Sequence, residues 1–167
     1  MQILKQLLTR PLRALPSSLV IAILVIAIVG FADATYLSVE HFLGVIPPCS
    51  ITGGCEKVLT SSYAEVFGIP VSLIGAVYYL LITIGSLVYL ESKHVSKLAK
   101  HNSEILRLSL FLTIPGFLAS LWFTAAQIFI IHSYCEYCLS SAIITTILFI
   151  LTMVVSKRFG GAKNENI

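Results

Sequence analysis

The sequence CEYCLSSAIITTILFILTMVV, residues 135–155, joins a pair of cysteines to an apolar run. The run itself, residues 139–155, has 17 residues, whereas a helix needs ~20 mostly apolar residues to cross a ~30 Å hydrocarbon core. A helix that begins near Cys135 reaches that length. We therefore expect a membrane helix over residues 136–156 whose first turn carries Cys135-Glu136-Tyr137-Cys138.

Three further apolar stretches predict membrane helices at about residues 17–39, 69–90 and 107–131. Hydrophobic residues make up 57% of the chain and charged residues 11%, against roughly 25% charged in soluble domains. Because lipid offers no partner to open backbone groups, each stretch should be helical. The sequence predicts an all-α membrane protein with a four-transmembrane-helix bundle, a single domain over residues 1–167 and a loop at about residues 40–68.

The positive charges predict the orientation in the membrane. Ten of the eleven Lys and Arg residues fall on one side of such a bundle: Lys5, Arg10, Arg13, Lys93, Lys97, Lys100, Arg107, Lys157, Arg158 and Lys163. Basic residues favour the cytoplasmic side. We expect a multi-pass protein of the plasma (inner) membrane, with both termini cytoplasmic and the loop 40–68 outside. Ala32-Asp33-Ala34 mimics a signal-peptide cleavage site, but the apolar character resumes at Tyr36, as in a full membrane helix.

All four cysteines of the chain fall on the predicted outer face: Cys49, Cys55, Cys135 and Cys138. Outside the cytoplasm, thiols can be held as disulfides. At a helix start, the C-x-x-C pair meets the positive end of the helix dipole, which lowers a thiol pKa. Gly53 and Gly54 permit the tight backbone turn that a Cys49–Cys55 ring requires. Two pairs on one side suit a relay of thiol–disulfide exchange.

Two other interpretations of the cysteines remain open. Four cysteines can form a zinc site, although the edge of a membrane on its exterior side is an unusual place for structural zinc. They can also form two inert disulfides in a membrane scaffold, although a C-x-x-C disulfide constrains little chain. We expect no metal, and no feature of the sequence indicates nucleic-acid binding.

A short interfacial helix is expected between the first two membrane helices. Ser62-Tyr63-Ala64-Glu65 has the pattern of a capping box, and apolar residues lie on both sides of it. Ser62 is interpreted as a helix cap, which leaves Ser61 as the serine with the better claim to a role in a site.

The chain from about residue 26 to 155 resembles the vitamin K epoxide reductase (VKOR) family. Its most specific parts are Cys49-x5-Cys55, the following residues 56–64, Phe67-Gly68-Ile69-Pro70, and Cys135-x-x-Cys138. The order and spacing resemble bacterial and archaeal members, here without a fused thioredoxin-like domain. The resemblance implies an oxidoreductase that oxidises a separate thioredoxin-like, DsbA-type protein outside the cytoplasm and passes electrons to a membrane quinone.

The resemblance also implies roles for single residues. Cys49 would exchange with the partner protein, Cys55 would attack Cys135, and Cys138 would face the quinone. Ser61 matches a serine near the quinone site of the family. Ala142 stands where the vitamin K-reducing animal members have a tyrosine, and this difference argues against reduction of vitamin K or its epoxide. That activity is therefore the alternative rather than the leading interpretation.

The third predicted helix supplies further candidates for a quinone pocket of apolar walls and few polar anchors. They are Trp122, Phe123 and Gln127, which lie toward the outer end of that helix. Asp33 is the only acidic residue within an apolar stretch and is therefore a candidate for function. His132 lies three residues before Cys135 and either assists a thiolate or meets lipid headgroups.

Overall fold

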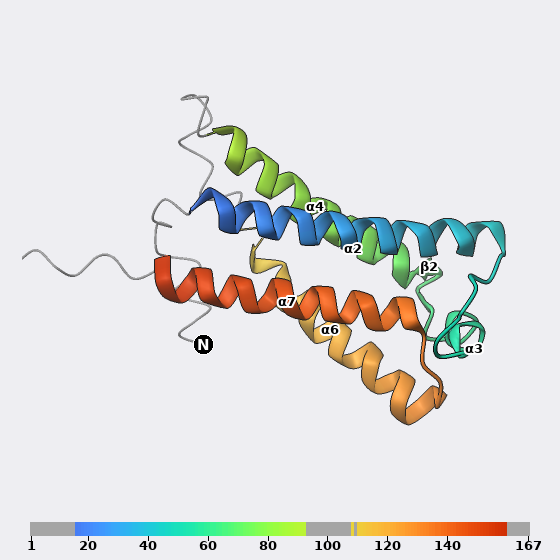
Figure 1. The fold of residues 1–167 in the computed structure, drawn as a ribbon. Coiled ribbons are helices and arrows are strands. Elements are labelled where there is room, and N and C mark those ends of the chain that lie inside the picture. The colour runs from blue at the N-terminus through green and yellow to red at the C-terminus, as the bar shows by residue number, and fades with distance from the viewer. Residues whose placement is uncertain (1–15, 93–107, 109, 160–167) are drawn as a thin grey trace, which may run out of the picture.

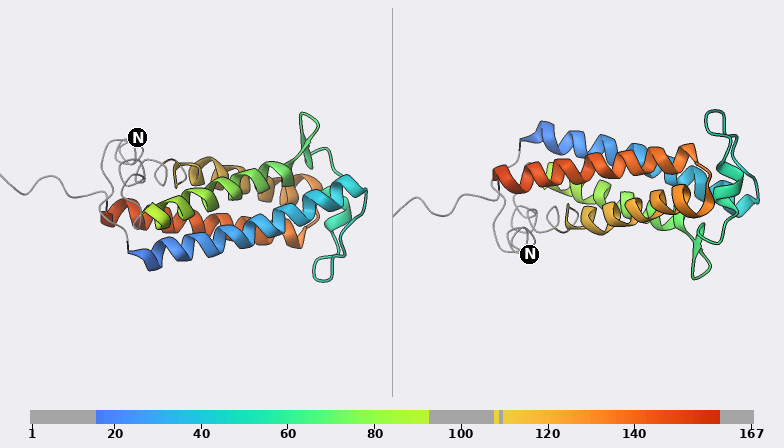
Figure 2. Two further views of the ribbon diagram at one scale, coloured as in Figure 1. Left: turned by 90° about the horizontal axis from the view of Figure 1, so that it is seen from above. Right: turned by 90° about the horizontal axis from the view of Figure 1, so that it is seen from below.

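A computed structural model of the chain describes residues 16–92, 108 and 110–159. Its long helices are α2 (Ser17–Leu43), α4 (Val71–Ser92), α6 (Thr113–Ala126) and α7 (Glu136–Phe159), and α6 continues into the π-helix η1 (Gln127–Ile131). Within this described part of the chain, four helices, with α6 and η1 counted together, are long and apolar enough to cross a membrane. Their side-by-side arrangement in Figures 1 and 2 confirms the predicted four-helix membrane bundle.

The ends of the helices follow local signals. Helix α2 runs to Leu43, four residues beyond the predicted end at 39, and stops at Gly44 in the left-handed conformation (φ 67°), whose N–H bonds the carbonyls of Glu40 and His41. Such a glycine ends many helices. Helix α4 begins at Val71 rather than 69, because Ile69 and Pro70 belong to a strand.

Most of the basic residues that predict the orientation lie outside the described residues. These are Lys5, Arg10, Arg13, Lys93, Lys97, Lys100, Arg107 and Lys163. The predicted start of the third membrane helix, Arg107, is among them.

Tyr79 ties three helices of the bundle together. Its ring packs on Gly30 of α2 so closely that a Cβ there would lie 2.5 Å from a ring carbon. Its hydroxyl lies 3.0 Å from the carbonyl oxygen of Ser141 and 2.8 Å from the Thr145 hydroxyl, both on α7. The side chain is only 1% exposed, and buried hydroxyls need such partners.

The connection between α2 and α4 lies at the end of the bundle where α2 ends and α7 begins (Figure 1). We call this the cysteine end. The connection contains α3 (Cys55–Leu59) and an antiparallel hairpin of β1 (Glu65–Val66) and β2 (Ile69–Pro70), with Glu65 opposite Pro70. Phe67 and Gly68, both with positive φ, form the turn. Figure 2 shows two loops projecting sideways from this end.

The capping-box interpretation of residues 62–65 is wrong. The short helix exists, but it is α3, which ends at Leu59 before Ser62. Glu65 instead begins β1 and lies 3.4 Å from His41 of α2. The pattern fails because the two-residue turn at Phe67 and Gly68 draws the segment into a hairpin.

Candidate active site

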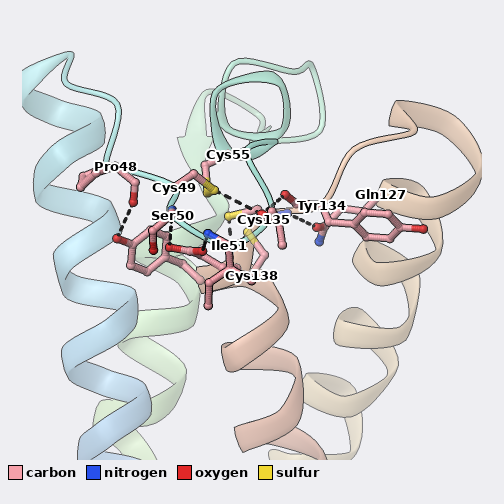
Figure 3. The surroundings of a disulfide bond; sticks show 12 residues. Pro48, Cys49, Ser50, Ile51, Cys55, Gln127, Tyr134, Cys135 and Cys138 are labelled. Carbon is pink, nitrogen blue, oxygen red and sulfur yellow. Dashed lines mark hydrogen bonds between the residues drawn. A yellow bond between two sulfur atoms is a disulfide. The ribbon is translucent and has the colours of Figure 1, made fainter.

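The four cysteines come together at the cysteine end. Cys55 and Cys135 are fully buried in one apolar cluster with Val58 and Ile131, and Cys49 and Cys138 pack against it. Cys49 and Cys55 form a disulfide, with 5.8 Å between their Cα atoms, whereas Cys135 and Cys138 are reduced. In Figure 3 the disulfide lies above the first turn of α7, which carries the C-x-x-C pair. The two pairs are therefore placed for thiol–disulfide exchange.

The start of α7 stabilises a thiolate at Cys135. A hydrogen bond from the Cys138 side chain lowers the pKa of the Cys135 thiol, against the opposing effect of burial. The backbone N–H of Cys138 also donates to Cys135 Sγ at 3.4 Å. A lowered pKa increases the thiolate fraction and makes Cys135 a better leaving group in disulfide exchange.

The segment that carries the C-x-x-C also holds the loop disulfide in place. The Glu136 carboxylate accepts hydrogen bonds from the backbone N–H groups of Ser50 (3.3 Å) and Ile51 (2.9 Å). The Thr52 hydroxyl donates to the Tyr134 carbonyl at 2.6 Å. The Tyr137 hydroxyl donates to the Pro48 carbonyl at 3.0 Å (Figure 3). The role of Glu136 is not predicted from the sequence, because nothing in C-E-Y-C indicates a contact to a distant loop.

A cavity of about 700 Å³ reaches the C-x-x-C from within the bundle. Its walls come from all four long helices and the connection between α2 and α4, and they are mostly apolar. Cys138 lines it, together with Asp33, Tyr79 and Ala142. Asp33 Oδ1 accepts a hydrogen bond from Ser140 at 3.4 Å, and its Oδ2 is buried with no hydrogen-bond partner among the described residues. One cysteine of the C-x-x-C is thus open to a ligand within the bundle.

The structure brings most of the predicted pocket residues to this cavity. Ser61, Phe123, Gln127 and Cys138 all line it. The Ser61 hydroxyl donates to the Val58 carbonyl at 2.7 Å.

Trp122 is the exception among the predicted pocket residues. It is 59% exposed on the outside of the bundle and does not line the cavity. The α6 residues that line the cavity, among them Gly116, Ala119 and Phe123, recur at every three or four positions, and Trp122 falls outside this face. His132 also lies away from the cavity, as the left-handed residue (φ 53°) that ends η1.

No three His, Cys, Asp or Glu side chains in the described residues lie together in a way that could hold a metal ion. Two of the four cysteines are joined in the Cys49–Cys55 disulfide. The arrangement differs from the four-thiolate zinc site that the cysteine count allows.

Gln127 has a structural role beside its place in the cavity wall. It is 3% exposed, and its Oε1 accepts a hydrogen bond from the backbone N–H of Cys135 at 2.9 Å. Its own carbonyl accepts from the N–H groups of His132 and Ser133. Gln127 therefore fixes the turn that leads into the C-x-x-C.

Replacing Gln127 with leucine is expected to destabilise the protein by about 1–3 kcal/mol, because a buried N–H loses its acceptor. Thermal unfolding in detergent measures this effect. Gln127→Glu is the matched control, since its carboxylate can still accept the bond. Equal stability of Gln127→Leu and the wild type would contradict this role.

Comparison with known proteins agrees with this geometry. The profile of the Vitamin K epoxide reductase family matches residues 21–153. A 124-residue stretch is 36% identical to the thiol-disulfide oxidoreductase LTO1 of Arabidopsis thaliana. That alignment covers 72% of this chain and 32% of the plant protein, so the chain spans about a third of the length of that relative. With four apolar helices and two cysteine pairs at one end, this chain belongs to the vitamin K epoxide reductase family.

Proposed function

We propose that the protein is a membrane thiol–quinone oxidoreductase that oxidises a separate thioredoxin-like protein and passes the electrons to a quinone. One observation carries this proposal: the C-x-x-C lies between the loop disulfide and the cavity. Cys135 packs in the same cluster as Cys55, whereas Cys138 lines the cavity. Two inert structural disulfides would not require one cysteine pair to contact both the other pair and a cavity.

The exposure of the cysteines supports an order of exchange. Cys49 is half-buried and Cys55 fully buried, so a partner thiolate reaches Cys49 and displaces Cys55. The second thiol of the partner then displaces Cys49, which leaves the loop pair reduced and the partner oxidised. This order fits a thioredoxin-like, DsbA-type partner.

Reoxidation of the loop uses the C-x-x-C in its disulfide form. The Cys55 thiolate attacks Cys135, and Cys138 leaves as a thiolate. Cys49 then attacks Cys55, and Cys135 leaves, which is favoured by its lowered pKa. The product is an oxidised loop above a reduced C-x-x-C, the combination found in the structure.

The cavity fits a quinone head group. Its volume of about 700 Å³ lies within the ~300–1,000 Å³ of small-molecule sites, and its apolar walls with few polar groups are typical of them. Ser61, Phe123 and Gln127 would hold the group, and Asp33 lies in the same wall. A bound quinone supplies a two-electron, two-proton acceptor for the dithiol of Cys135 and Cys138.

We further propose that residues 1–167 act as one membrane domain of the plasma (inner) membrane. Both termini would be cytoplasmic and the cysteine end outside. The positions of the basic residues support this orientation, and a disulfide at the cysteine end suits an oxidising compartment.

The proposal is tested by counting thiols in the purified protein. The protein is reduced, freed of reductant and mixed without oxygen with a ubiquinone or menaquinone analogue. We expect loss of all four thiols only when quinone is present. Absence of quinone-dependent loss would refute the proposal and favour structural disulfides. Faster turnover of vitamin K epoxide than of any quinone would favour the alternative activity of the family.

A further inference from the structure

We propose that Glu136 is a positioning residue that docks the Cys49–Cys55 loop on the C-x-x-C turn and thereby sets the rate of disulfide transfer between the two pairs. The inference rests on the proposed function, because it concerns the transfer step within it. Glu136 lies between Cys135 and Cys138, so the turn that carries the reacting disulfide also binds the loop. We call the contact of Glu136 with Ser50 and Ile51 the dock.

The first support is the geometry of the carboxylate. Its two oxygens each accept one of two successive N–H groups, of Ser50 at 3.3 Å and of Ile51 at 2.9 Å. Hydrogen bonds to an ionised acceptor are about twice as strong as neutral ones. No Lys, Arg or His in the described part of the chain forms an ion pair with Glu136. The charge is therefore directed at the loop backbone.

The second support is the position of the docked residues. Ser50 and Ile51 follow Cys49 directly, and the Ile51 side chain is 86% exposed. Ile51 therefore gains little anchorage from burial. The other hydrogen bonds between this loop and residues 134–138 run from Thr52 to Tyr134 and from Tyr137 to Pro48. Among the hydrogen bonds of the described residues that join the loop to this segment, those of Glu136 are the only ones with a charged side chain.

The third support is that disulfide exchange between the two cysteine pairs requires a fixed position of the attacking sulfur. In disulfide exchange the attacking thiolate must approach the sulfur that it attacks in a defined geometry. A displacement of about 1 Å can slow a positioned reaction by about 10²-fold. Cys55 lies only four residues after Ile51, so the dock constrains the place from which Cys55 approaches Cys135. The quinone step involves Cys138 on the cavity side, and none of residues 49–55 lines that cavity.

A single-turnover experiment separates the two steps. Fully reduced protein receives one equivalent of a quinone analogue without oxygen, and samples are quenched with acid, alkylated and analysed by mass spectrometry. In the wild type we expect a disulfide first at Cys135–Cys138 and then at Cys49–Cys55. In Glu136→Ala the first should appear at the wild-type rate, and the second should appear at least about tenfold more slowly.

Two further variants sharpen the test. Glu136→Gln should show a smaller delay, because its amide oxygen can still accept one of the two bonds. Glu91→Gln makes the same substitution near the C-terminal end of α4, far from the cysteine end of the bundle. This variant should form both disulfides at the wild-type rates. Equal slowing of both steps in Glu136→Ala, or of neither, would overturn the proposal.

Hydrogen exchange tests the dock independently of the quinone. The amides of Ser50 and Ile51 should exchange faster in Glu136→Ala than in the wild type, since they lose their acceptor. Unchanged exchange would refute the dock even in an active enzyme. A wild-type protein that never reacts with quinone would instead refute the proposed function, while the exchange data would still decide the dock.

Discussion

Replacing Cys138 with alanine is expected to reduce quinone-dependent thiol oxidation to below about 1% of the wild-type rate, because the reaction loses its nucleophile. Of the four cysteines, all of which lie in the described part of the chain, only Cys138 lines the cavity. Cys135 is 0% exposed. The variant also leaves Cys135 without its partner in the C-x-x-C disulfide. It therefore lacks the dithiol that would pass two electrons to the quinone.

Two controls separate this loss from misfolding. The Cys49–Cys55 disulfide should still be reduced by dithiothreitol at the wild-type rate in Cys138→Ala, since that pair does not require Cys138. Ile143→Ala removes a side chain that is 61% exposed on the same helix and should retain quinone-dependent oxidation. Retention of more than a tenth of the wild-type rate in Cys138→Ala would contradict the assignment of Cys138.

The second large effect is expected at Gly54, directly before Cys55. A Cβ at this position would lie 2.7 Å from the carbonyl oxygen and 2.9 Å from the nitrogen of Tyr134. These are backbone atoms that cannot rotate away, so an alanine must push the loop off the start of α7. We expect Gly54→Ala to slow transfer between the two cysteine pairs by about 10²-fold, as for a reactant displaced by ~1 Å. The single-turnover assay measures the rate.

Gly53 provides the matched control for Gly54. It has a φ of +62° and open space around its missing Cβ. Gly53→Ala should therefore destabilise the protein by about 1 kcal/mol through backbone strain, without displacing Cys55. Thermal unfolding measures the strain. Equal transfer rates in the two variants would show that the contact between Gly54 and Tyr134 does not position the loop.

The predicted pocket illustrates the limit of sequence reasoning. Phe123 and Trp122 are both aromatic and adjacent, so the pattern favoured neither. The packing of α6 against α7 turns Phe123 inward and Trp122 outward. Gln127 was predicted as a polar anchor, but its bond to the Cys135 N–H depends on the chain reversing after η1. The direction of a side chain within a bundle is a property of the packing.

The capping box shows the same limit on a shorter scale. Ser62 and Glu65 have the right spacing to cap a helix, yet Glu65 starts a strand that pairs with Pro70. A local pattern is overridden when a nearby turn offers the backbone other hydrogen bonds.

The sequence by itself determined the four membrane helices and the gathering of all cysteines at one end. Both follow from local properties, since about 20 apolar residues span the hydrocarbon core and must be helical there. The tertiary structure alone decided that Glu136 docks the loop and that Gln127 holds Cys135. The docking contacts join residues 82 to 89 positions apart. Such contacts depend on how the helices pack, which no local pattern of residues encodes.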